Sequence, residues 1–229
     1  MLANKMNATI VICNPKGGSG KTTLSTNLAV ALSRLNYSVT LHDLDPQLSC
    51  SDWIRCRNPL SNNIQLSLDF DTRALGWHIF DTPAGFLPEQ LAKVSLQANY
   101  LLIPVLPSSF DIHACVRFLM SLNKADLFHR NWKMAMVANR VKSGTLSQRT
   151  LDAFLEHLQI PFISELSDSQ NYVKASERGM GLLDLPPYRI NKEAKKWQQI
   201  LNWLDIDSSS LESNVSPLQN LQNISSSHA

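Results

Sequence analysis

The sequence lacks the features that mark membrane and exported proteins. Its 229 residues contain no apolar run of about 18, the length that a membrane-spanning helix needs. The opening residues, MLANKMNA, are too few and too polar for a signal peptide. We therefore expect a cytoplasmic protein, and a hydrophobic content of 44% is enough for it to build a substantial core.

Cysteine is scarce, and its spacing is not that of a metal cluster. The four cysteines (Cys13, Cys50, Cys56 and Cys115) form no C-x-x-C pair, so we interpret them as small buried apolar residues in a reducing compartment. None of the six histidines lies in a ligand-spaced cluster, and no nucleophile stands out beside a base. These absences argue against a conventional catalytic site.

The charge balance is also modest, with a net charge of +2. The last 25 residues carry three acidic residues and no Lys or Arg, so residues 1–204 hold 21 basic and 16 acidic residues. A net positive charge of this size allows nucleic-acid binding but does not require it.

What the sequence does contain is an alternation of strand-like and helix-like segments. Apolar strands are predicted at 9–13, 39–43, 64–68, 77–81, 100–105, 133–139 and 162–164. Helices are predicted at 22–35, 50–57, 89–97, 112–127, 147–157 and 191–204. Continuous apolar strands separated by helices indicate an α/β fold, a mostly parallel, doubly wound sheet with helices on both faces.

The composition changes after residue 204. Residues 205–229 are rich in Ser and Asn and contain no aromatic residue, so we expect a domain over 1–204 followed by a disordered tail over 205–229. Leu218, Leu221 and Ile224 recur every three residues, which leaves a short partner-binding helix in this tail as an alternative.

The most informative segment is NPKGGSGKTT, Asn14 to Thr23, between the first predicted strand and the first predicted helix. A glycine-rich turn in this setting directs backbone N–H groups at a phosphate chain. Lys21 can reach the β- and γ-phosphates, and the Thr22 hydroxyl can ligate Mg²⁺. The segment predicts an ATP site formed by Gly17, Gly18, Ser19, Gly20, Lys21, Thr22 and Thr23.

The loop departs from the common G-x-x-x-x-G-K-[ST] pattern, because Pro15 stands where the first glycine is expected and a second lysine, Lys16, comes early. In this it resembles the deviant P-loop of the ParA/MinD ATPases, and its Asn-Pro start is most similar to the small, ParF-like partition type. The resemblance spans residues 9–204. It implies that Lys16 acts on the nucleotide of the opposite subunit in a homodimer that ATP closes.

Two aspartate motifs follow in the order that the same family uses. Asp45 lies in DLDPQ, which resembles switch I. The resemblance implies that Asp45 supports hydrolysis by positioning the attacking water or by holding a metal-bound water. Asp81 ends the strand IFD before Thr-Pro-Ala-Gly, which resembles switch II, and is expected near Mg²⁺. By the same resemblance, Asn139 in VANRV is expected to bond the adenine edge, with helix or strand capping as the alternative.

The family resemblance also implies a working cycle. The ATP-bound dimer binds double-stranded DNA without sequence preference, and a stimulating adaptor, ParB-like or specific to a cargo, triggers slow hydrolysis. Such a protein would associate with the nucleoid and position a plasmid, a chromosome or a protein organelle. Basic residues that could neutralise phosphates are Lys174, Arg178, Arg189, Lys192, Lys195 and Lys196, with a solubilising helix face as the alternative.

Two rival functions remain open on the sequence. A MinD-like protein would bind a membrane surface, and residues 191–204 place Trp197, Ile200, Leu201 and Leu204 on one face of a helix that could lie on a bilayer. The same face fits a helix packed on its own sheet, and membrane recruitment is not our expectation. An ATP-dependent metabolic enzyme on the same loop is the second rival.

Overall fold

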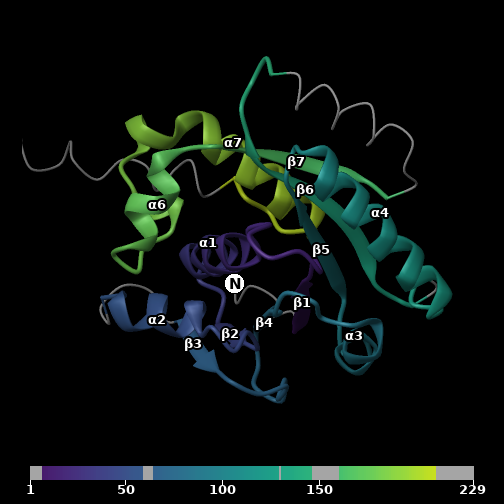
Figure 1. The fold of residues 1–229 in the computed structure, drawn as a ribbon. Helices are drawn as coiled ribbons and strands as arrows, with labels where there is room; N and C mark the ends of the chain where they lie inside the picture. The colour runs from purple at the N-terminus through teal and green to yellow at the C-terminus, as the bar shows by residue number, and fades with distance from the viewer. Residues whose placement is uncertain (1–6, 59–63, 129, 146–159, 210–229) are drawn as a thin grey trace, which may run out of the picture.

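The structure, a computed structural model, describes residues 7–58, 64–128, 130–145 and 160–209. Seven strands form one sheet in the order β3-β2-β4-β1-β5-β6-β7, and every described pairing is parallel (Figure 1). The strands are β1 (Ala8–Ile12), β2 (Val39–Asp43), β3 (Ile64–Ser67), β4 (Trp77–Asp81), β5 (Tyr100–Val105), β6 (Lys133–Val141) and β7 (Phe162–Ser167). This confirms the predicted α/β class with a doubly wound sheet.

Helices cover both faces of this sheet. They are α1 (Lys21–Arg34), α2 (Ser49–Cys56), α3 (Pro88–Ser95), α4 (Ser109–Lys124), α6 (Gln170–Ser176) and α7 (Pro187–Trp203), with a 3₁₀ turn, η1, at Leu182–Asp184. Alternate strand residues point to opposite faces. Ile10 and Ile12 therefore join a core with α1, α2 and α7, whereas Val11 joins a second core with α3 and α4.

The predicted element boundaries hold within a few residues, and the departures have local causes. Helix α4 begins three residues earlier than predicted because the Ser108 side chain accepts a hydrogen bond from the Asp111 N–H and caps it. Helix α7 begins at Pro187, since proline is tolerated in the first turn. The sequence did not predict α6 or η1, and the helix predicted at 147–157 lies outside the described residues.

The last helix packs on its own sheet. Trp197, Ile200 and Leu201 on α7 are fully buried in the core formed with α1, and Leu204 just after it is 1% exposed. The apolar face that left a membrane surface open as a partner is thus covered by the protein itself. Among the described helices, none is long and apolar enough to cross a membrane.

The packed part of the chain extends a little past the predicted domain end. Ile206 is 4% exposed and belongs to the same core as α7, and its N–H donates to the Leu201 carbonyl. The predicted tail from 205 therefore starts with packed residues, and its remainder, 210–229, lies outside the described part of the chain.

Candidate nucleotide and metal site

The start of the loop between β1 and α1 is fixed by three hydrogen bonds. The Asn14 side-chain amide donates to the Pro104 carbonyl on β5 at 2.7 Å, and its oxygen accepts from the Lys16 N–H at 2.9 Å. The Gly85 N–H donates to the Pro15 carbonyl at 2.8 Å. The predicted phosphate loop is therefore held against both β5 and the segment that follows β4, which resembles switch II.

Gly20 closes the loop at the start of α1, where no other residue fits. Its φ is +95°, in the left-handed region that L side chains disfavour. A Cβ at this position would lie 1.8 Å from the Asn139 side-chain nitrogen. The Asn139 amide uses that space to donate to the Ser19 carbonyl at 3.0 Å, so the end of β6 rests directly on the loop.

Lys21 is the buried lysine of the loop. It is 6% exposed, and its ammonium donates to the carbonyls of Asn14 at 3.1 Å and Lys16 at 3.3 Å. In the described part of the chain no carboxylate pairs with Lys21, so its ammonium can still bind an anion. Its role in binding the phosphate chain stays a prediction.

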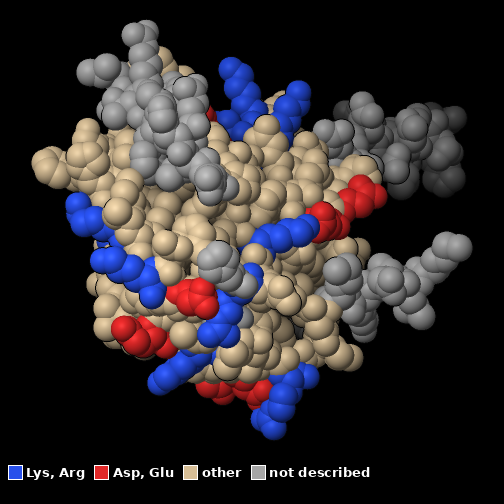
Figure 2. Space-filling view, turned by 90° about the vertical axis from the view of Figure 1, so that its right-hand side faces the viewer, with Lys and Arg blue, Asp and Glu red and all other residues tan. Residues whose placement is uncertain are grey.

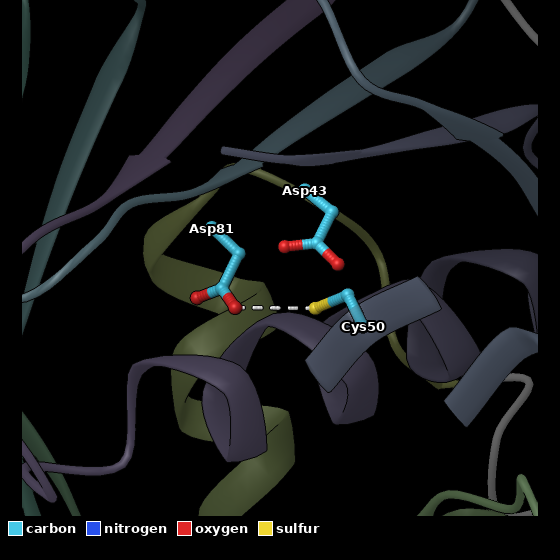
Figure 3. A group of neighbouring side chains, drawn as sticks. All are labelled: Asp43, Cys50 and Asp81. Carbon is cyan, nitrogen blue, oxygen red and sulfur yellow. Dashed lines mark hydrogen bonds between the residues drawn. The ribbon is translucent and has the colours of Figure 1, made fainter. Parts of the chain in front are cut away.

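Asp81 lies at the centre of a buried polar cluster beneath the loop (Figure 3). Its carboxylate accepts hydrogen bonds from Thr22 at 2.7 Å, Ser25 at 3.0 Å and the Cys50 thiol at 3.2 Å. Burial raises the pKa of Asp81 to about 6, against the lowering effect of the Thr22, Cys50 and Ser25 bonds, and the nearby charge of Asp43 adds to the rise. The structure thus brings together two predicted residues, Thr22 and Asp81.

Asp43, which the sequence analysis did not single out, lies next to Asp81 in the sheet register. One of its oxygens accepts from both the backbone N–H and the hydroxyl of Ser51, at 2.8 and 2.7 Å, which ties the end of β2 to α2. Asp43 is the last residue of β2 and is paired in register with Asp81, whereas Asp45 lies in the turn beyond the strand. Asp43 rather than Asp45 is the residue beside Asp81.

The oxygen atoms of this cluster fit Mg²⁺. Hard cations of this kind take carboxylate and hydroxyl oxygens, and Asp81 and Thr22 present both within one hydrogen bond of each other. Within the described ranges, neither Asp43 nor Asp81 forms an ion pair, so two buried carboxylates lie together without a cationic side chain. Thr22 and Asp81 are the residues that would hold the ion.

A cavity of about 250 Å³ opens above the cluster. The loop lines it with every residue from Gly17 to Thr23 except the buried Ser19. The other lining residues are Asp45, Gln47, Ser49, Ala84 and Arg140. Asp45 is half-buried there, and its carboxylate accepts from the Gln47 N–H at 2.9 Å. The predicted hydrolytic aspartate therefore lies at the same cavity as the phosphate loop.

A second cavity of about 470 Å³ adjoins the first and shares Thr23 and Arg140 with it. Asn139, the β7–α6 connection and α6 supply the other walls. The first cavity, beside the loop, suits the phosphates of a nucleotide. The larger second cavity, lined by polar and apolar groups, suits a base that extends away from the loop. Asn139 lies where a base could meet it, although in this structure its amide bonds the loop.

Lys16, the early lysine of the loop, is held within its own chain. Its ammonium lies 2.9 Å from an Asp111 oxygen at the start of α4, with the lysine side chain 40% exposed and the aspartate 7%. The sequence did not predict this pairing of Lys16 with Asp111. The lysine end of this ion pair is partly exposed, so a more strongly charged partner can reach the Lys16 ammonium.

The predicted DNA-contacting residues are all on or near α6 and α7, at the upper left of Figure 1. Lys174, Arg178, Arg189, Lys192 and Lys195 are exposed. Lys196 differs, because its ammonium donates to Glu193 at 2.7 Å and to Ser167 at 2.5 Å. On the opposite side, which carries α4, Figure 2 shows basic side chains spread among acidic ones with no continuous basic patch over the visible described residues.

The chain is similar in sequence to known proteins. The family model for the CobQ/CobB/MinD/ParA nucleotide binding domain matches residues 10–183. A relative from Halothiobacillus neapolitanus, named maintenance of carboxysome distribution protein A, is 26% identical over 219 residues, which are 88% of this chain and 98% of that protein.

Solved structures share the fold at low identity. A protein of Borrelia burgdorferi B31 named for plasmid partition, bound to AMPPNP, superposes with a TM-score of 0.69 at 18% identity, over 86% of this chain and 99% of that one. An ATP complex of McdA from Cyanothece gives 0.66 at 19% identity, over 87% and 97%. Nucleotide complexes therefore occur on the same fold.

Proposed function

The chain belongs to the CobQ/CobB/MinD/ParA nucleotide-binding family, and from this premise we propose that it is a ParA-type ATPase whose ATP-bound dimer binds DNA without sequence preference and positions a cargo. The observation that carries the proposal is the phosphate loop with two lysines in different settings. Lys21 is buried at the cavity, and Lys16 is half-exposed and forms an ion pair with Asp111.

The residues of the cavity would divide the work on ATP. Lys21 would exchange its two carbonyl partners for phosphate oxygens, and the loop's N–H groups would bind the remaining charge. Mg²⁺, held by Thr22 and Asp81, would neutralise charge on the phosphates. Asp45, at the cavity wall, would orient the attacking water by accepting a hydrogen bond from it.

Dimerisation would involve Lys16. The triphosphate of a second subunit carries several negative charges, so it is a stronger partner for the Lys16 ammonium than the single carboxylate of Asp111. We propose that ATP in one subunit draws Lys16 of the other away from Asp111, which makes closure of the dimer depend on nucleotide.

The DNA surface is proposed on α6 and α7. Five exposed basic side chains there could each neutralise a phosphate, and such contacts give affinity that falls with salt and ignores sequence. Lys196 is the weakest candidate, because its charge is already engaged by Glu193. Tyr188 is 75% exposed beside Arg189 and could pack against the sugar–phosphate backbone.

We propose that a stimulating adaptor protein links the cargo to the DNA-bound dimer. The relative that matches nearly the whole chain is named for carboxysome distribution, and a protein with the same fold is named for plasmid partition. The first of these favours a protein organelle and the second a plasmid. The adaptor would act by raising a slow intrinsic rate of hydrolysis.

The decisive experiment measures binding of the full-length protein to random double-stranded DNA without nucleotide, with ADP and with ATP, over a series of salt concentrations. We expect binding with ATP only, weakening steeply with salt. Lys16→Ala should abolish the ATP-dependent binding, whereas the exposed Lys93→Ala on α3 should retain it. Absence of DNA binding in every state, with dimerisation intact, would overturn the DNA part of the proposal.

A further inference from the structure

Three side chains with metal-binding atoms meet beneath the nucleotide loop (Figure 3). They are Asp43 from the end of β2, Cys50 from α2 and Asp81 from the end of β4, and one ligand atom from each lies within 4.8 Å of the other two. All three are buried, with exposed fractions of 3%, 0% and 0%. Three such groups buried together differ from a solvated group of surface carboxylates.

The charges of this cluster are unbalanced. Asp43 and Asp81 accept hydrogen bonds from hydroxyl, amide and thiol donors only, and in the described part of the chain no Lys, Arg or His pairs with either. Two buried carboxylates without a counter-charge are costly, and a bound cation removes that cost. This imbalance points to a cation independently of the ligand geometry.

The donor set goes beyond what Mg²⁺ requires. Mg²⁺ takes an octahedron of oxygen atoms and has little affinity for sulfur. Zn²⁺ and similar cations accept oxygen at about 2.1 Å and thiolate sulfur at about 2.3 Å in a tetrahedron, which places the two ligand atoms roughly 3.6 Å apart. The Cys50 sulfur lies 3.2 Å from an Asp81 oxygen, close to that separation.

We propose that Asp43, Cys50 and Asp81 form a binding site for a divalent cation of the zinc type, with the Cys50 sulfur as the ligand that selects it over Mg²⁺. On binding, the thiol proton passes to solvent and a metal–sulfur bond replaces the Cys50–Asp81 hydrogen bond. Thr22, which bonds Asp81, and Ser49, which precedes Cys50, both line the 250 Å³ cavity, so the cation has an entrance.

Occupation of this site has a consequence for the nucleotide site. Asp81 is shared between the two, and a zinc-type cation on Asp81 and Cys50 removes the carboxylate that would help Thr22 hold Mg²⁺. We infer that such a cation inhibits ATP hydrolysis. This second part rests on the proposed function, whereas binding of the cation does not.

The test uses Co²⁺ as a spectroscopic probe on the full-length, nucleotide-free protein in a buffer without thiol reductants. One equivalent of Co²⁺ should produce a near-ultraviolet thiolate-to-cobalt absorption together with the visible bands of tetrahedral Co²⁺. Cys50→Ser should lose the thiolate absorption, and Asp43→Asn should bind at least tenfold more weakly. Cys56→Ser, which removes the exposed cysteine of the same helix, should retain the full spectrum.

Two outcomes would overturn the site. One is wild-type protein without a thiolate-to-cobalt band, and the other is a band that survives Cys50→Ser but disappears in Cys56→Ser, which would place the metal on the exposed thiol. Circular dichroism of Cys50→Ser, with Cys50→Ala as a second variant, separates loss of the ligand from loss of the fold.

The inhibitory part has its own readout. Zn²⁺ should inhibit ATP hydrolysis in Mg²⁺, and Cys50→Ser should require at least tenfold more Zn²⁺ for the same fractional loss of its own rate. Equal sensitivity of the two proteins would refute the inhibition. If the wild-type protein hydrolyses no ATP at all, the proposed function fails while the cobalt spectrum still decides the metal site.

Discussion

At the scale of single residues, Gly20 carries the largest steric demand of the site. Gly20→Ala would place a Cβ at a φ of +95° and 1.8 Å from the Asn139 nitrogen. We expect the substitution to weaken ATP binding by more than tenfold and to lower the melting temperature, because the loop must move to avoid Asn139. A fluorescent ATP analogue and thermal melts measure the two effects.

Gly18→Ala is the matched control for this prediction. Gly18 also has a positive φ, +75°, but no atom lies within 4 Å of the position that a Cβ would occupy. The Gly18→Ala variant should lose only about 1 kcal/mol of unfolding free energy, because alanine is strained at a positive φ. Asn139→Ala in the Gly20→Ala background should restore part of the melting temperature, and if it restores nothing, the close contact is not the cause.

Asp45 is the residue to which hydrolysis is assigned. Asp45→Ala should still bind ATP, because Lys21 and the loop are intact, but should hydrolyse it at least tenfold more slowly and accumulate as a dimer. Phosphate release and size-exclusion chromatography with light scattering check this. Asp52→Ala removes an exposed carboxylate on α2 and should behave like the wild type. Wild-type turnover in Asp45→Ala would remove that residue from the mechanism.

At the scale of the element, α7 presents two adjacent lysines in different states. Lys195 is exposed, whereas the Lys196 ammonium is paired with Glu193 and Ser167. Lys195→Gln should weaken DNA binding with ATP and lower the slope of log K against log salt by about 1. Lys196→Gln should change the slope much less. Equal slopes for both variants would move the DNA surface away from α7.

The same helix contributes an acid-sensitive contact to stability. Burial raises the pKa of Glu193, but hydrogen bonds from Lys196 and Ser167 lower it more, so its net pKa lies below the ordinary 4.5. The folded state therefore binds this proton less readily than the unfolded state, and the stabilisation is present above pH 4.5 and lost as the pH falls through the folded pKa.

Glu193→Gln tests this contribution. The variant should be less stable than the wild type at pH 7, by roughly 1–3 kcal/mol, because glutamine has no negative charge to pair with Lys196 and only one acceptor oxygen for the Lys196 and Tyr172 donors. The difference should shrink when both proteins are unfolded with urea near pH 3.5. A difference that stays constant between the two pH values would exclude Glu193 as the titrating group.

At the scale of the whole molecule, Trp197 joins α7 to the sheet. Its ring is fully buried in the core that α1 shares, and its indole N–H donates to Tyr172 at 3.1 Å. Trp197→Ala should cost about 3–5 kcal/mol of unfolding free energy, measured by chemical denaturation. Phe110→Ala, at an 82% exposed position, should stay within about 0.5 kcal/mol of the wild type.

This prediction also separates two readings of α7. If its apolar face served a membrane surface, the protein in solution would not depend on Trp197, and Trp197→Ala would leave stability unchanged. The burial of Trp197, Ile200 and Leu201 instead makes the helix part of the core. The polar side of α7 then remains for a charged partner.

The sequence alone determined the parallel sheet and the phosphate loop, since both depend on local order. Strands β2, β4 and β5 end where the apolar runs end, and NPKGGSGKTT needs only its neighbours to form a loop ahead of a helix. The small elements α6 and η1 escaped prediction because they carry too few residues to show a periodicity. The roles given to Asp45, Asn139 and Lys16 remain predictions.

Only the tertiary structure decided which side chains meet. Thr22 and Asp81 are 59 positions apart in the sequence. Lys16 follows β1 and Asp111 follows β5, and the two side chains meet because these strands are neighbours in the sheet. Asp43 and Cys50 join Asp81 because β2 pairs with β4 in a register that sets Asp43 opposite Asp81. Strand order and register depend on how the whole core packs, so no local pattern in the sequence specifies these contacts.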